Sequence, residues 1–153
     1  MKPIAGPQTA RVIILSFVFF ALLILIDACK EDSSTSPVIT YPAVAGQWSG
    51  VVEQPPLIYD VTWSIAQSRY ALSGTSLWTI RSSGSQTECW FVGTISTSRQ
   101  VALQETSYVP LNWSGSGWAL ASYSGRLNTT EDSLGLTWQV SGGGTGDFVL
   151  TKQ

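Results

Sequence analysis

The stretch "YDVTWSIAQSRYALSGTSLW", residues 59–78, carries the pattern that decides the fold. In its first half, bulky side chains alternate with smaller or polar ones, and the bulky ones are Tyr59, Val61, Trp63 and Ile65. A period of two places every second side chain on the same face of a β-strand. Residues 67–69 can turn the chain, and the period then resumes from Tyr70 to Trp78. We therefore expect two antiparallel strands that share one buried face.

The same pattern continues on both sides of this hairpin. Further strands are expected at residues 46–52, 89–95, 101–105, 118–128, 134–140 and 148–150. The links between them are short and rich in Gly, Ser and Thr, which favours sequential antiparallel pairing, a meander. Eight such strands can close into a barrel, which removes exposed sheet edges. The expected fold is all-β, an eight-stranded antiparallel up-and-down barrel.

Composition excludes several classes of function. Charged residues are only 12% of the 153, and the net charge of −2 offers no basic face for nucleic acid. The chain has no histidine, which rules out Ser-His-Asp and Cys-His catalysis and removes the commonest metal ligand. The carboxylates are scattered, without the spacing of an acid–base pair. We therefore expect no catalytic activity, no metal and no cofactor.

The N-terminus predicts export from the cytoplasm. Lys2 and Arg11 precede an apolar run at residues 12–26 that Ser16 alone interrupts. A helix of this length spans about 22 Å, less than the ~30 Å core of a bilayer. A basic start followed by a short apolar run is typical of a secretory signal peptide. The alternatives are an uncleaved membrane anchor and an ordinary cleaved secretory signal.

The sequence "IDAC", residues 26–29, follows the apolar run directly and resembles the lipobox of bacterial lipoproteins. The resemblance implies a signal peptide at residues 1–28, lipidation of Cys29, and a bacterial outer-membrane lipoprotein anchored through that lipid. Lys30, Glu31 and Asp32 resemble the surface-export signal of Bacteroidetes lipoproteins; the alternative is a solvated tether. Prolines and hydroxyl side chains indicate an extended linker, so residues 29–45 are expected to be a lipidated, flexible tether.

The tripeptide "GQW", residues 46–48, resembles the start of the first strand in lipocalins and avidins, the calycin group. In those folds the tryptophan plugs one barrel end beneath a basic residue of the last strand. The resemblance gives these structural roles to Trp48 and Lys152 and assigns residues 46–153 to a lipocalin-like barrel. The biotin-binding pattern of avidins is not recognisable, so biotin is not predicted.

Several side chains are candidates for a ligand site inside the barrel. The aromatic candidates are Trp63, Tyr70, Trp78, Tyr123 and Trp138. They could line a cavity and stack on a ligand, or they could simply fill the barrel. Glu105 shares the inward parity of Val101 and Leu103, so it is expected to be a buried carboxylate or to reach solvent at the mouth. Arg126 on the next strand is a candidate partner for it.

Two functions follow from these observations. The first is non-catalytic binding in the cell envelope, either of a small apolar ligand or of an envelope partner. The second is a protein-interaction or protease-inhibitor module with a fully packed barrel. They differ in one structural property, because a ligand binder needs a cavity of about 300 Å³ or more.

Overall fold

The structure, a computed structural model, describes residues 37–112 and 118–153, and its barrel domain spans Ile39–Gln153. The expected signal peptide, Cys29 and the charged residues after it lie outside the described residues. The strands are β1 Gly46–Gln54, β2 Leu57–Ser68, β3 Ala71–Ile80, β4 Gln86–Ile95, β5 Gln100–Pro110, β6 Ala121–Leu127, β7 Ser133–Val140 and β8 Thr145–Lys152. No helix with the length and hydropathy to cross a bilayer occurs in these two ranges.

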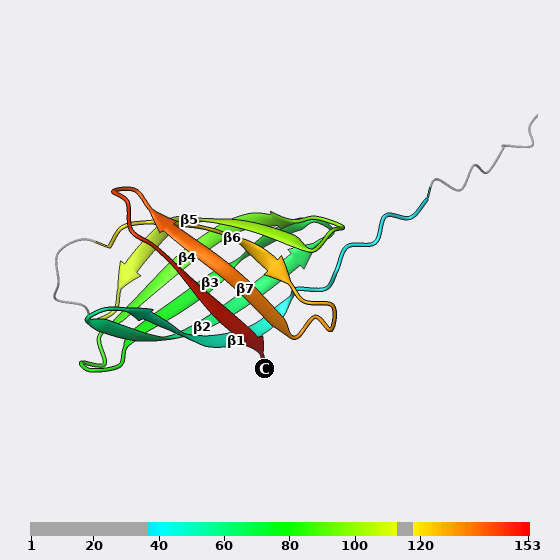
Figure 1. Cartoon of the computed structure of the whole chain (residues 1–153). Helices are drawn as coiled ribbons and strands as arrows, with labels where there is room; N and C mark the ends of the chain where they lie inside the picture. The colour runs from blue at the N-terminus through cyan, green and yellow to red at the C-terminus, as the bar shows by residue number, and fades with distance from the viewer. Residues whose placement is uncertain (1–36, 113–117) are drawn as a thin grey trace, which may run out of the picture. The chain divides into compact units, whose positions relative to one another are not determined.

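The strands form a closed antiparallel barrel in sequence order (Figure 1). Each strand pairs with its neighbours along the chain, and β1 pairs with β8 to close the ring. The predicted fold class is confirmed, and the architecture is consistent with a calycin-like barrel. Gly50 sits at the closure, where a Cβ atom would come within 2.4 Å of the Val149 carbonyl oxygen. Glycine therefore permits the close approach of β1 and β8.

Inward and outward side chains alternate along the strands as the period of two predicts. On β2 the inward side chains Tyr59, Val61, Trp63 and Ile65 are all buried. On β3 the inward set begins at Leu72. Tyr70 instead lies in the turn between the two strands and is 53% exposed. The expectation that Tyr70 lines the barrel is therefore wrong, because the turn extends one residue further than the alternation suggested.

Aromatic rings pack the middle of the barrel. The Trp63 ring lies 4.9 Å from Phe91, 5.0 Å from Tyr123 and 6.0 Å from Phe148, measured between centroids. Trp63 and Phe91 are almost entirely buried. This layer comes from β2, β4, β6 and β8, so it ties opposite walls of the barrel together.

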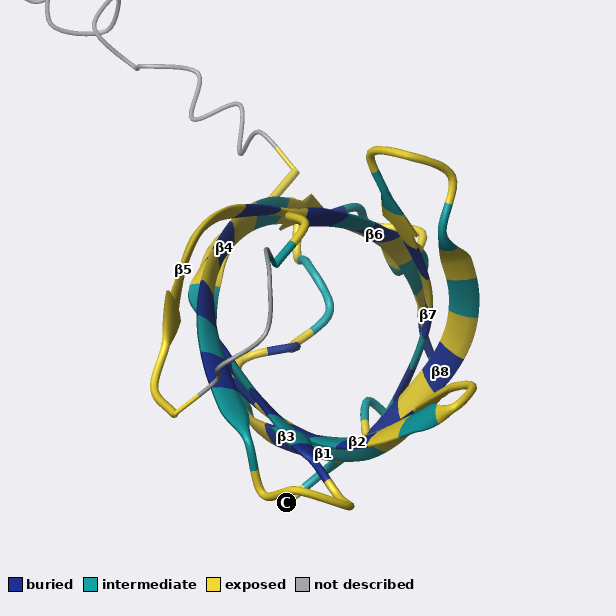
Figure 2. Cartoon of the chain, turned by 90° about the vertical axis from the view of Figure 1, so that its left-hand side faces the viewer, coloured by how far each residue is buried: buried dark blue, intermediate teal, exposed yellow. Residues whose placement is uncertain are grey.

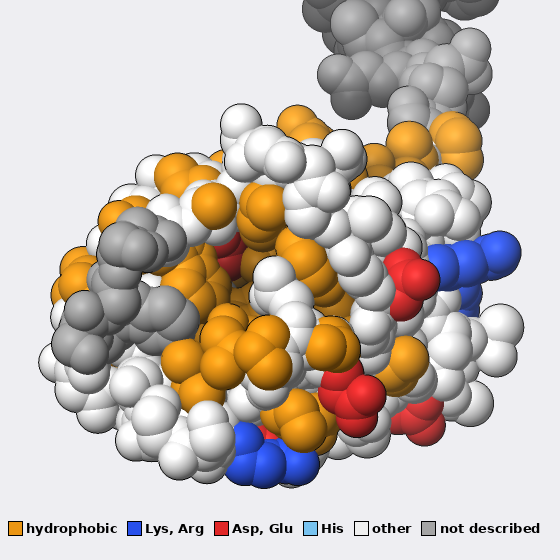
Figure 3. Space-filling view, turned by 60° about the vertical axis from the view of Figure 1, so that its left-hand side comes forward, with side chains coloured by type: hydrophobic (Ala, Val, Ile, Leu, Met, Phe, Trp, Pro, Cys, Tyr) orange, Lys and Arg blue, Asp and Glu red, His pale blue; other side chains and the backbone are white. Residues whose placement is uncertain are grey.

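The two ends of the barrel differ. Figure 2 looks along the axis into the end where β1 finishes and β8 begins, which we call the open end. Figure 3 shows hydrophobic side chains gathered around a hollow there. At the opposite end, which we call the closed end, residues 41–45 cross the bore; we call them the strap. Contacts at the closed end stabilise the fold, and the candidate site lies at the open end.

Trp48 plugs the closed end beneath the strap. Its indole Nε1 donates a hydrogen bond to the Val44 carbonyl at 2.9 Å, and both side chains are fully buried. The register Trp48↔Lys152 brings the last strand alongside, with the Lys152 Nζ 5.4 Å from the centroid of the indole ring. The ammonium also donates to the Ala43 carbonyl at 3.4 Å. Packing, a hydrogen bond and a cation–π contact thus meet at one place.

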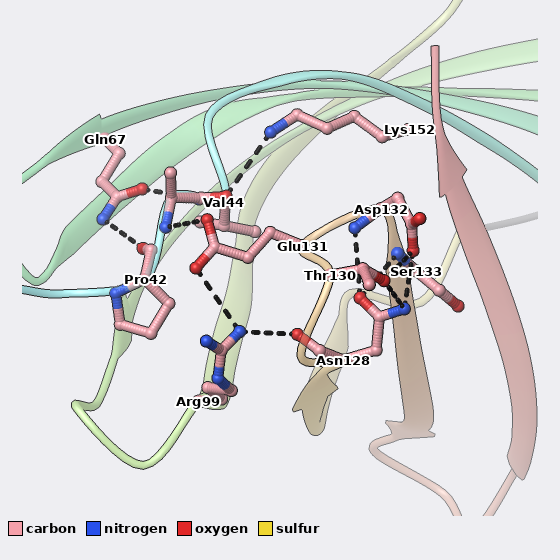
Figure 4. Close-up of polar contacts among 11 residues, drawn as sticks. Pro42, Val44, Gln67, Arg99, Asn128, Thr130, Glu131, Asp132, Ser133 and Lys152 are labelled. Carbon is pink, nitrogen blue, oxygen red and sulfur yellow. Dashed lines mark hydrogen bonds and ion pairs between the residues drawn. The ribbon is translucent and has the colours of Figure 1, made fainter.

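Side chains from the end of β2 and from the link between β6 and β7 hold the strap in place (Figure 4). Gln67 accepts from the Val44 amide at 2.8 Å and donates to the Pro42 carbonyl at 2.9 Å. Glu131 accepts from the Ala43 amide at 3.0 Å and forms an ion pair with Arg99. Residues 41–45 therefore belong to the barrel domain. Residues 41–45 were expected in the flexible tether, but their backbone groups are bonded to the barrel.

We predict that Val44→Ala lowers the free energy of unfolding by about 2 kcal/mol, because two buried methyl groups are lost and leave a cavity. Val38→Ala is the matched control, since Val38 is 90% exposed whereas Val44 is 0% exposed. Urea unfolding followed by tryptophan fluorescence measures both. Equal stabilities for the two variants would show that the strap does not stabilise the barrel.

A candidate ligand cavity at the open end

A cavity of about 290 Å³ opens at this end of the barrel. Its lining is apolar or aromatic except for one amide side chain, that of Gln54. The lining residues are Val52, Gln54, Leu57, Tyr59, Trp78, Trp118, Ala119, Ala121, Tyr123, Trp138 and Val140. The volume lies at the lower limit of ligand pockets, about 300 Å³. The barrel is therefore packed in its middle and hollow at its open end.

Three aromatic rings form one wall of the cavity, which we call the aromatic cup: Tyr59, Trp78 and Trp118. Their centroids lie 5.8 Å apart for Tyr59 and Trp78, 6.5 Å for Tyr59 and Trp118, and 5.7 Å for Trp78 and Trp118. Tyr59 and Trp78 come from adjacent strands, β2 and β3. Trp118 precedes β6 and packs over them from outside the ladder. The cup offers rings in several orientations to a small ligand.

Trp138 forms another part of the lining, and two glycines of the β7–β8 hairpin make room for it. A Cβ atom on Gly146 would lie 2.6 Å from the Trp138 Nε1, and one on Gly144 would lie 3.2 Å from the indole carbons. The indole N–H has no hydrogen-bond partner among the described residues. The glycine-rich hairpin thus has a packing role, since it accommodates the indole against β8.

Glu105 lies where β5 and β6 separate. Their paired residues run from Gln100↔Arg126 to Gln104↔Ser122 and stop there. Beside this point the β4–β5 register shifts between Trp90 and Phe91, which makes Thr106 the extra residue of a β-bulge. Bulges end strand pairing and redirect side chains, often beside functional sites. The seam between β5 and β6 is therefore completed by side chains.

The Glu105 carboxylate takes the place of a backbone acceptor at this seam. Its Oε2 accepts from the Ala121 amide at 2.9 Å and from the Trp118 indole at 3.4 Å, while Oε1 accepts from the Tyr123 hydroxyl at 2.6 Å. Glu105 is only 2% exposed, so the expectation of a buried carboxylate holds. Arg126 is exposed on the outer face of β6, so the pairing considered for it does not form.

The polar cluster continues from Glu105 along the inner face of β3 and β4. Cys89 is fully buried between Glu105 and Ser76, and the Ser76 hydroxyl accepts from the Trp78 indole at 3.0 Å. Burial raises the pKa of the Cys89 thiol, and the charge of Glu105 raises it further. Burial and Glu105 likewise raise the pKa of the Tyr123 phenol. Both groups therefore keep their protons at neutral pH.

The structure brings four of the six predicted ligand residues together. Trp78, Tyr123 and Trp138 line the cavity, and Glu105 lies directly behind them. Trp63 belongs to the packed layer below, and Tyr70 lies in a turn outside the barrel.

Sequence reasoning did not assign two residues of the aromatic cup to the site. Tyr59 could have been found, because it shares the alternation of Trp63. Trp118 could not, because residues 118–120 were expected to belong to the sixth strand, whereas β6 begins at Ala121. Only the strand separation places its indole over the cavity.

The sequence of this chain matches no protein-family model, and no curated protein is significantly similar to it. Within residues 37–112 and 118–153, no group of three or more Cys, Asp and Glu residues is placed to hold a metal ion. The site must therefore be interpreted from its own geometry.

The raised pKa values predict that stability falls as pH rises above about 8.5. The unfolded chain releases the Cys89 and Tyr123 protons near pH 8.5 and 10, whereas the folded chain retains them, so the unfolded state binds fewer protons. Each group can contribute a slope of up to about 1.4 kcal/mol per pH unit. Urea unfolding between pH 7 and 11 measures it. Cys89→Ala should reduce the slope between pH 9 and 10, and Tyr70→Phe, in an exposed turn, should not. An unchanged profile in Cys89→Ala would contradict the assignment.

Proposed function

We propose that this protein is a non-catalytic binding protein of the bacterial cell envelope that holds a small apolar ligand in the open-end cavity. The proposal rests on one observation, a hollow whose lining is almost entirely apolar and aromatic. The middle of the barrel next to this hollow is packed with aromatic rings. Ligand pockets typically combine such a lining with a few fixed polar groups. Gln54 at the lining and the Glu105–Tyr123 pair behind it are the polar groups here.

The cavity favours this function over a packed interaction module. A module that acts only through its surface needs no hollow, and an unfilled apolar cavity costs stability. The volume of about 290 Å³ suits a ligand of one or two rings and not a long acyl chain. The residues that follow the separation of β5 from β6, Trp118 and Ala121, line the cavity, and the bulge lies behind them beside Glu105.

The proposed location rests on the N-terminal residues. The apolar run at residues 12–26 is too short to span a bilayer, and Cys29 follows it in a lipobox-like context. Acyl chains on Cys29 would anchor the protein, since each buried methylene contributes about 0.8 kcal/mol. The barrel would then face the periplasm or the cell exterior.

We predict that Ala121→Leu abolishes binding of small neutral aromatic compounds, because the larger side chain occupies the cavity that Ala121 lines. Naphthalene is a suitable probe, measured by ligand-detected NMR on the full chain in a maltoside detergent. Ala102→Leu is the matched control, since Ala102 is exposed on the outer face of neighbouring β5. The control should bind as the wild type does. Absence of binding in the wild type, or equal binding in both variants, would contradict a ligand site in this cavity.

We predict that Cys29→Ala prevents both lipidation of the protein and removal of its signal peptide. The unmodified variant keeps its signal peptide, so it should migrate as a larger species that incorporates no labelled palmitate in a bacterial host. Mass spectrometry of the wild-type N-terminus provides the independent measurement. A variant of unchanged mass that stays in the membrane would instead support an uncleaved anchor.

A further inference from the structure

Among the described residues, the hydrogen-bond donors around the Glu105 carboxylate are neutral. They include a main-chain amide, a phenol and an indole, from Ala121, Tyr123 and Trp118, and the buried Cys89 thiol also lies beside the carboxylate. Both carboxylate oxygens act as acceptors, as in an ionised carboxylate. A buried charge is normally paired with an opposite charge, since hydrogen bonds offset only part of the lost hydration. None of the ion pairs in the described ranges involves Glu105.

None of the described cations is paired with Glu105 or belongs to the cavity lining. Arg99 and Lys152 hold the strap at the closed end, and Arg81 forms an exposed ion pair with Asp60. The cavity lining contains no charged residue. In contrast, the amide, the phenol and the indole that donate to Glu105 belong to residues that also line the cavity. One side chain thus separates the cavity from the negative charge of Glu105, which no cation in residues 37–112 and 118–153 neutralises.

The aromatic cup lies on the same side of the cavity. Trp118 belongs both to the cup and to the donors of Glu105, and its ring lies 5.7 Å from that of Trp78. The faces of tryptophan and tyrosine rings attract cations within about 6 Å, and this attraction strengthens when water is excluded. Several aromatic rings around one hollow, with a carboxylate behind them, are the recognition elements of an organic ammonium ion.

We propose that the ligand of the open-end cavity is an organic ammonium ion with a small apolar body. The cation would lie among the rings of the aromatic cup, next to Glu105, and the apolar body against Val52, Leu57 and Val140. This inference rests on the proposed function, because it names the ligand class of the same cavity. It also predicts that anionic ligands are excluded, since they would lie close to an unneutralised carboxylate.

The competing interpretation gives Glu105 a purely structural role at the β5–β6 seam. Glutamine at this position can still accept from the Ala121 amide and keeps the size of the side chain, so Glu105→Gln removes the charge while preserving the seam. A structural role predicts that the variant binds cationic and neutral ligands in the same ratio as the wild type. Recognition of a cation predicts that the ratio falls.

The test compares three probes of similar shape: phenyltrimethylammonium, its neutral isostere tert-butylbenzene, and the anion benzenesulfonate. Binding to the full chain in maltoside detergent is measured by ligand-detected NMR titration at pH 7. We expect the cation to bind at least tenfold more tightly than the neutral isostere, and the anion not to bind. Glu105→Gln should reduce the preference to twofold or less with little change for the neutral probe. Glu53→Gln removes an exposed charge of β1 and should keep the full preference.

Trp78→Leu provides a second test, because it removes one ring of the cup and leaves Glu105 in place. It should weaken binding of the cation at least fivefold more than binding of the neutral isostere. Equal affinities for the cation and the neutral isostere in the wild type would overturn the inference and leave the proposed function intact. An unchanged preference in Glu105→Gln would also overturn it. Failure of all three probes to bind would contradict the proposed function itself.

Discussion

Three residue pairs between β1 and β8 close the barrel. Trp48, Ser49 and Gly50 pair with Lys152, Thr151 and Leu150, and the pairing goes no further toward the open end. This register places Lys152 over Trp48 and lets the strap cover both. The cavity lies at the other end, beyond the last of these pairs. The short ladder is therefore found at the sealed end, and the hollow lies where β1 and β8 are no longer paired.

At the second seam, between β5 and β6, backbone pairing is also incomplete, and side chains complete the connection between the strands. Backbone pairing stops at Gln104, and the next donor, the Ala121 amide, bonds to the carboxylate of Glu105. Gln104 donates to the Ala121 carbonyl at 3.1 Å and completes the connection. Leaving these buried groups unpaired would cost about 1–3 kcal/mol each. The seam thus stabilises the barrel and, as a consequence, brings a charged group to the cavity wall.

The prediction of the fold succeeded because a period of two is a local property. Alternation along residues 59–65 reports which face of β2 is buried, and short polar links permit only sequential antiparallel pairing. The strap was not predicted, because residues 41–45 have no period and their order comes from Gln67 and Glu131, which are distant in the sequence. Tyr70 was misplaced for a related reason, since the length of a turn depends on how the paired strands end.

The site was only partly predictable. Parity along the strands identified Trp78, Tyr123, Trp138 and the burial of Glu105, because those depend on which face of a strand a residue occupies. Such residues fill the bore or surround a hollow depending on how wide the barrel is at their position along its axis. The alternation along a strand gives no information about this width. Trp63 and Trp78 share one parity pattern, yet one is packed in the middle and the other lines the cavity.

Alternation and chain order in the sequence were enough to predict the class of fold and the inward faces of the strands, because they specify a meander. The roles of Trp48 and Lys152 at one end came instead from the resemblance to calycins. The tertiary structure was needed to show that the open end is hollow, that Trp118 covers it, and that Glu105 lies behind its wall with no basic partner among the described residues. Those features arise where two strands separate, and strand separation depends on contacts between residues from the whole barrel.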